Sequence, residues 1–141
     1  MNLSRIKKMS YKLLIGLLTL VILFHCFVIA KIIPYNIAWG GKLKNDSEMY
    51  FLETISILMN VFLIIVLLMK FNYITHRFSN KLIIGILWFF QALFILNTVG
   101  NMFAKSNGEK YFAIITFFFV ILIGIILKKS DRSNSPSEEL K

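Results

Sequence analysis

Long apolar stretches separated by short polar ones are the main structural signal in this chain. Four stretches are almost wholly apolar, at 13–30, 49–69, 82–104 and 111–127. Each is close to the ~20 residues with which a helix crosses a hydrocarbon core of ~30 Å, with ~17 as the lower limit. No stretch has the strict alternation of a membrane β-strand or a charged face for water. We therefore predict four transmembrane helices, at about 11–32, 47–71, 80–104 and 107–129.

Short polar connections between these stretches predict how the helices are arranged. Asp46–Glu48 and Ser79–Asn80 supply capping residues before the second and third helices. Ser106 and Glu109 have the spacing of a capping box before the fourth helix, and so tight a turn makes helices three and four antiparallel neighbours. The predicted fold is all-α: a single transmembrane domain over 1–129, forming an antiparallel four-helix bundle in the membrane. Residues 130–141 are polar and lack aromatic side chains, which predicts a disordered tail.

The first apolar stretch also has some features of a cleaved signal peptide. A basic leader, Arg5–Lys8, precedes it, and Val28–Ala30 loosely resembles a cleavage site. However, the apolar run of 18 residues exceeds the 7–15 residues of a usual signal core. We expect a retained helix.

Composition and charge agree with a membrane protein. The 141-residue chain is 57% hydrophobic and only 16% charged, with a mean hydropathy of +0.73, whereas a soluble domain is about 25% charged. The net charge of +9 comes from basic residues at the ends of the apolar stretches. This placement is typical of membrane topology and anionic headgroups, and it disfavours a nucleic-acid partner.

The distribution of Lys and Arg predicts the orientation. With four spans, the leader, the middle connection and the tail share one side and carry eleven basic residues, against five on the other side. The positive-inside rule then places both termini in the cytoplasm. The composition, rich in Ile, Lys, Asn and Phe, suits a low-GC bacterium, so we expect a multi-pass protein of the bacterial inner membrane.

Polar side chains inside the predicted spans are the candidates for a functional site, because each is costly in a bilayer unless it is paired. By depth, Glu53, Asn97, Asn101 and His25 fall in the outer half of the membrane and Asn60 falls near its midplane. Glu53, Ser56 and Asn60 share one face of the second helix. On the third helix, Asn97, Asn101, Thr98 and Gln91 fall within a sector of ~120°. Two polar faces at one depth predict a common cavity, to which His25 would contribute.

Each of these residues also has a structural interpretation. Asn97 and Asn101 could be interhelical hydrogen-bonding groups, and Ser56 and Thr54 could bond to their own helix. His25 could be a neutral histidine bonded to a carbonyl group. Glu53 could reach the membrane surface or pair with Lys42 or Lys44. The single cysteine, Cys26, is expected to pack as a small apolar side chain in the first helix.

No sequence motif for a metal, cofactor or nucleophile is present. His25 and His76 fall on opposite sides of the membrane, so we expect no metal site and no cofactor. A catalytic role would need Glu53 as acid or base, with His25 or the asparagines as partners. In residue type alone, this set loosely resembles membrane lipid isomerases of the sterol-isomerase type.

A closer resemblance lies in two segments. "IPYNIAWGGKLKNDSEMYFLETISILMN", residues 33–60, and "LNTVGNMFAK", residues 96–105, resemble segments of an uncharacterised family of small bacterial four-helix membrane proteins. The resemblance covers about a quarter of the chain. It implies a protein class and a location in the inner membrane, but no activity.

We hypothesise a non-enzymatic binding, interaction or accessory protein with an outward-facing polar pocket. The expected ligand-binding residues are Glu53, Asn60, Asn97, Asn101 and Trp39, with His25 as a further member and 34–44 as a lid. The first alternative is a membrane enzyme acting on a lipid-like substrate through Glu53, and the second is a proton-coupled carrier. Beyond the lipid bilayer, expected partners are a small-molecule or lipid ligand, a second copy of the chain, or another membrane protein.

Overall fold

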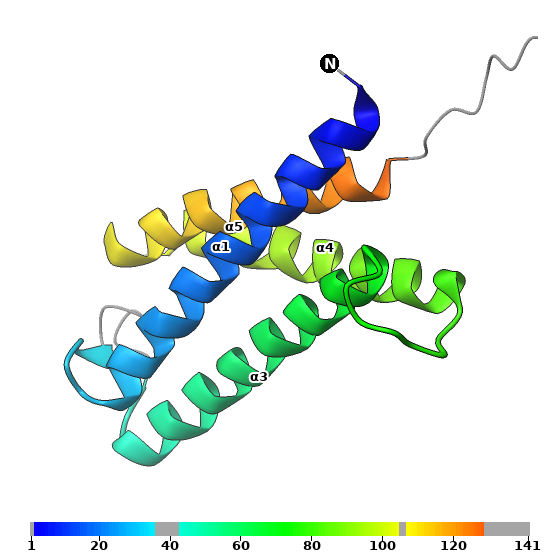
Figure 1. Ribbon diagram of the computed structural model, residues 1–141. Helices are drawn as coiled ribbons and strands as arrows, with labels where there is room; N and C mark the ends of the chain where they lie inside the picture. The colour runs from blue at the N-terminus through cyan, green and yellow to red at the C-terminus, as the bar shows by residue number, and fades with distance from the viewer. Residues whose placement is uncertain (1, 36–42, 105–106, 129–141) are drawn as a thin grey trace, which may run out of the picture.

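The computed structural model describes residues 2–35, 43–104 and 107–128. These form four α-helices, α1 (Leu3–Ile29), α3 (Asp46–Lys70), α4 (Asn80–Met102) and α5 (Asn107–Leu127) (Figure 1). The helices pack antiparallel, and each is long and apolar enough to cross a membrane. The predicted all-α, four-helix class is thus confirmed, and the chain is a multi-pass membrane protein with four spans. Trp39, Lys42, Ser106 and the expected tail at 130–141 lie outside the described residues.

The start of α1 differs most from the sequence prediction. The helix begins at Leu3 rather than near residue 11, so the basic leader is helical. Asn2 caps it by accepting a hydrogen bond from the Ser4 amide at 3.3 Å. Hydropathy marks only the part of a helix inside the hydrocarbon, so it missed these first two turns.

The other helix ends are closer to the prediction and have local causes. Ser79 caps α4 as predicted, by accepting from the Leu82 amide. The N-cap of α3 is Asn45, one residue before the predicted segment, and the Glu48 carboxylate reaches back to the Lys44 amide.

Two helices stop in the same way. Lys31 after α1 and Asn72 after α3 both have a φ of 58°. The backbone hydrogen bonds around each form a Schellman motif, which turns the chain out of the helix. This is why α1 ends at Ile29, earlier than the predicted residue 32.

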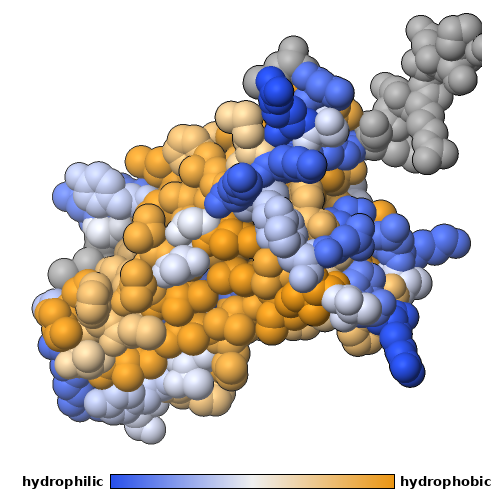
Figure 2. Space-filling view, viewed as in Figure 1, coloured by the Kyte–Doolittle hydropathy of each residue, from blue (hydrophilic) through white to orange (hydrophobic). Residues whose placement is uncertain are grey.

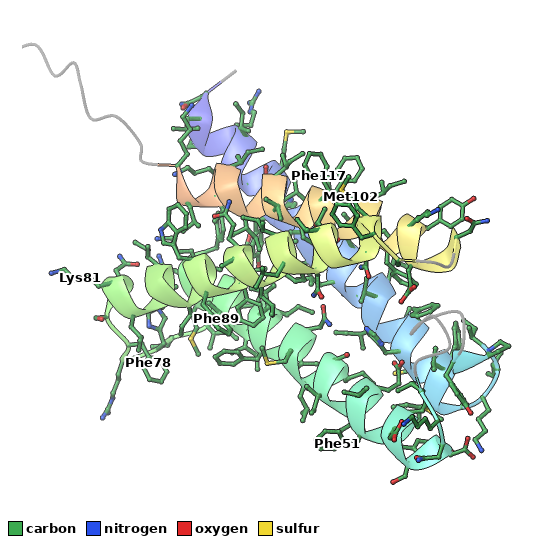
Figure 3. The ribbon with its side chains drawn as sticks, turned by 180° about the vertical axis from the view of Figure 1, so that it is seen from behind. Phe51, Phe78, Lys81, Phe89, Met102 and Phe117 are labelled. Atoms are coloured by element: carbon green, nitrogen blue, oxygen red, sulfur yellow. The ribbon has the colours of Figure 1, made fainter. Side chains whose placement is uncertain are left out.

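The helices form two antiparallel pairs, α1 with α3 and α4 with α5. Contacts between the pairs join α1 to α5 and α3 to α4. Figures 1 and 3 show that the pairs cross at an angle and diverge toward the α1–α3 and α4–α5 connections. We name that end of the bundle the open end, and the opposite end, where the chain begins, the closed end.

The closed end holds the main hydrophobic core. Its buried residues come from the first half of α1 and α4 and from the second half of α3 and α5, and include Leu14, Leu67, Leu87 and Ile123. Tyr11, 5% exposed, lies against Phe71 and Tyr73, with ring centroids 4.2 and 5.4 Å away. This packing draws all four helices together at the closed end.

A seam of polar contacts runs along the interface of α4 and α5. The hydroxyl groups of Thr98 and Thr116 are hydrogen-bonded at 2.9 Å, and Gln91 Nε2 donates to the Val120 carbonyl at 3.4 Å. Gly124 makes room for Gln91, since a Cβ on Gly124 would lie 3.1 Å from Gln91 Nε2. Such interhelical bonds substitute for the hydrophobic effect, which does not drive helices together within lipid.

The outer surface of the bundle is apolar. Figure 2 shows a broad hydrophobic surface, with hydrophilic side chains gathered near the ends of the helices. Phe51, Phe89, Met102 and Phe117 lie on this surface, each more than half exposed (Figure 3). Exposed aromatic and aliphatic side chains from several helices match a lipid environment and not water.

We predict that the α4–α5 seam is sensitive to the size of residue 124. Gly124→Leu should lower the free energy of unfolding by about 1–3 kcal/mol, because the added side chain must displace Gln91. Gly85→Leu is the matched control, since a Cβ there meets nothing within 4 Å. Denaturant unfolding in detergent micelles, followed by helical circular dichroism, measures the free energy of unfolding of both variants. Equal losses of stability would contradict the close packing of Gln91 against Gly124.

Candidate functional site

A cavity of about 560 Å³ lies between the helices in the half of the bundle nearer the open end. All four helices contribute to its wall. Polar lining residues are His25, Ser56, Asn60, Asn97, Asn101, Glu109 and Thr116. The rest of the wall is mainly aromatic and aliphatic, with Phe24, Phe94 and Phe112 among its members. Phe24 of α1 and Phe112 of α5 bring the two helix pairs into contact at the cavity wall, with ring centroids 4.9 Å apart.

The structure brings most of the predicted site residues together. Asn60 from α3, Asn97 and Asn101 from α4, and His25 from α1 all line the cavity. Glu53 does not line it, and Trp39 lies outside the described residues. That these residues bind a ligand remains a prediction.

Glu53 is fully buried and is hydrogen-bonded to His25. The distance from His25 Nδ1 to Glu53 Oε2 is 2.5 Å, with the Glu53 side chain 0% and the His25 side chain 14% exposed. The contact joins the end of α1 to the start of α3. A carboxyl group inside the bilayer needs a donor, and the imidazole is one. His25 therefore bonds to a side chain, instead of the carbonyl group that its structural interpretation suggested.

His25 connects the buried Glu53 to the cavity. One ring nitrogen faces Glu53, while the residue also forms part of the cavity wall. A carboxylate behind an imidazole fixes the orientation of the ring. The group placed to touch a bound molecule is therefore His25, and Glu53 is placed to position it.

Asn60 carries an unsatisfied hydrogen-bonding group. Its Nδ2 donates to the Ser56 carbonyl within its own helix, at 2.7 Å. Its Oδ1 is buried without a hydrogen-bond partner among the described residues. Buried polar atoms in proteins are nearly all satisfied, so this oxygen is an exception.

Some residues in the predicted polar faces lie elsewhere. Thr98 and Gln91 belong to the α4–α5 seam and do not line the cavity, although they share a sector with Asn97. Two polar lining residues, Glu109 and Thr116 of α5, are not among the residues predicted to form the site. The sequence predicts only a capping role for Glu109, which is 6% exposed. With Phe112, these two have the i, i+3, i+7 spacing of one helical face, which could have revealed them.

Comparison of the chain with known proteins does not assign it to a family. No protein-family model, curated protein or solved structure matches the chain. The resemblance in residues 33–60 and 96–105 thus identifies no family, and the supported class is a small four-span membrane protein. Within residues 2–35, 43–104 and 107–128, no three His, Cys, Asp or Glu side chains come together as metal ligands.

We predict measurable coupling between His25 and Glu53. In a double-mutant cycle of His25→Ala, Glu53→Leu and the double variant, the coupling energy should be about 1–2 kcal/mol, because each single change removes a buried hydrogen bond. Denaturant unfolding in micelles gives the four free energies. Additive effects of the two substitutions would rule out the contact.

Proposed function

We propose that the protein binds a small amphipathic molecule with an uncharged, hydrogen-bonding head in the cavity, without changing it chemically. The observation that carries this proposal is a cavity of about 560 Å³ with mainly apolar walls, whose polar lining includes the amide side chains of Asn60, Asn97 and Asn101. A hydroxyl or amide head could hydrogen-bond to these amide groups. The apolar part of the ligand would lie against the phenylalanines.

Size and charge of the cavity support this class of ligand. Its volume of about 560 Å³ falls within the ~300–1,000 Å³ of small-molecule sites. Amide groups of Asn60, Asn97 and Asn101 can both donate and accept hydrogen bonds. No Lys or Arg is among the lining residues, while Glu109 is. Without a lysine or arginine in the wall, an anionic head would have no permanent cation to pair with, which favours a neutral head.

The proposal includes an orientation in a bacterial inner membrane. Eight basic residues lie at or near the closed end: Arg5, Lys7, Lys8, Lys12, Lys70, Arg77, Lys81 and Lys128. Three described basic residues lie at the open end: Lys31, Lys44 and Lys110. The positive-inside rule therefore favours a cytoplasmic closed end and an outward-facing cavity.

One observation favours a membrane enzyme as the second candidate. The His25–Glu53 pair has the arrangement of a general base with an orienting carboxylate, and the imidazole faces the cavity. In such an enzyme His25 would take or give the proton, and Glu53 would act through it.

A proton-coupled carrier is less well supported. It would need a passage through the closed end, where Tyr11 and the hydrophobic core pack tightly.

We predict that filling the cavity blocks binding. Gly100 lines the cavity and a Cβ there meets nothing within 4 Å, so Gly100→Phe should fold and occupy the site. The probe is 1-oleoylglycerol, and native mass spectrometry counts the molecules bound to protein released from micelles. Gly100→Phe should lower its occupancy at least about tenfold, the effect expected of losing ~1.4 kcal/mol.

Controls for this experiment separate binding from catalysis. Gly85→Phe, whose added side chain also meets open space, should bind like the wild type. Oleate, with its anionic head, should bind more weakly than 1-oleoylglycerol. Recovery of the probe with unchanged mass supports a binding protein, whereas a changed mass that depends on His25 supports the enzyme. Equal occupancy in both glycine variants would refute the cavity as the site.

We predict opposite accessibility of the two ends in cells. In a Cys26→Ser background, a cysteine replacing the exposed Lys44 should react with a membrane-impermeant maleimide in intact cells. A cysteine replacing Arg77 should react only after the membrane is permeabilised. The opposite labelling pattern would place the cavity on the cytoplasmic side.

A further inference from the structure

A second, smaller pocket lies at the closed end, far along the helices from the cavity. Its volume is about 270 Å³, and its wall combines three lysines with four apolar residues. The lysines are Lys7 of α1, Lys70 of α3 and Lys128, which follows α5. Lysines more than a hundred positions apart in the sequence thus line one pocket.

The positions of these lysines are tied to the fold. Lys7 Nζ donates to the carbonyl oxygen of Lys128, so the start of α1 is attached to the end of α5. Lys70 is the last residue of α3 and is half-buried. The helical start of α1, capped by Asn2, places Lys7 here. The pocket is therefore a product of how the helix ends meet.

No carboxylate among the described residues neutralises this pocket. The four described acids, Asp46, Glu48, Glu53 and Glu109, all lie at the open end. The seven lining residues include no acid. Ammonium groups of lysines that line one pocket repel one another, and an anion between them would remove this repulsion.

The apolar part of the wall indicates what kind of anion fits. Phe71, Ile84, Ile126 and Leu127 supply it, and α4 contributes Ile84. A free inorganic anion would make no use of these side chains. A phosphate ester with an apolar body would use both surfaces, with its phosphate between the lysines. At about 270 Å³ the pocket can hold a headgroup, while acyl chains would lie along the outer surface of the helices.

We propose that this pocket is a specific site for a phosphate group, and that its occupant is the headgroup of an anionic phospholipid. Basic pockets between transmembrane helices are a recurring form of anionic-lipid recognition. Topology alone requires an excess of basic residues on one side of the membrane, but not their convergence on one pocket. The site is separate from the cavity at the open end and does not depend on its function.

Native mass spectrometry of the full chain with defined lipids tests the proposal. The probes are dioleoylphosphatidylglycerol and dioleoylphosphatidylcholine, each added alone to protein in a neutral detergent. The wild type should retain phosphatidylglycerol in preference to phosphatidylcholine. Lys7→Gln, Lys70→Gln and Lys128→Gln should each weaken phosphatidylglycerol binding about fivefold, as expected for removing one basic residue near a headgroup.

The matched control uses basic residues at the same end outside the pocket. The triple pocket variant combines Lys7→Gln, Lys70→Gln and Lys128→Gln. The control triple variant Lys8→Gln, Lys12→Gln, Lys81→Gln has the same net charge and should bind nearly as the wild type. Circular dichroism of each variant checks folding. Equal losses in the two triple variants would show diffuse surface attraction and overturn the proposal, as would equal retention of the two lipids by the wild type.

A soluble phosphate ester distinguishes the source of the phosphate. Glycerol 3-phosphate should compete with phosphatidylglycerol only weakly, because it lacks the apolar body. Competition at equal concentration would support the phosphate site but overturn the assignment to a lipid.

Discussion

A carboxyl group enclosed among membrane helices must be hydrogen-bonded inside the protein, and the structure depends on how this chain meets that constraint. Glu53 is fully buried, and His25 provides a partner from the neighbouring helix. The contact holds α1 against α3 at the end where this pair leaves α4 and α5. The Thr98–Thr116 bond does the same for the other pair. Because each pair has its own polar contact there, the pairs can diverge and leave a cavity between them.

The two ends of the bundle consequently have different physical characters. At the closed end, apolar packing joins all four helices and gathers the helix ends so that lysines meet. Toward the open end, acids and amides lie among mainly apolar cavity walls, and each helix pair has a polar contact of its own. One fold thus presents a basic pocket at one end and a neutral to acidic cavity at the other. The basic pocket should therefore prefer anionic ligands, and the cavity should prefer neutral ones.

Apolar length and connection length were enough to predict the helices and their antiparallel arrangement, since both follow from the thickness of a bilayer. The depth of polar residues also indicated which half of the bundle holds the cavity. The side-chain contacts between helices were harder to predict from the sequence, because a sector of ~120° on one helix faces two neighbouring helices. Thr98 and Gln91 therefore lie in the seam while Asn97 lines the cavity. Nothing in the spacing showed that His25 separates Glu53 from the cavity.

An unsatisfied polar atom does not define a binding site by itself. Gln91 Oε1 is also buried without a partner among the described residues, but it belongs to a side chain that crosses the narrow α4–α5 seam. There, Gly124 leaves so little room that even a Cβ would touch the amide. Asn60 Oδ1 is equally buried, although other parts of Asn60 line a cavity of about 560 Å³. The space in this cavity beside the amide groups of Asn60, Asn97 and Asn101, and not an unmet acceptor, is therefore what favours a ligand there.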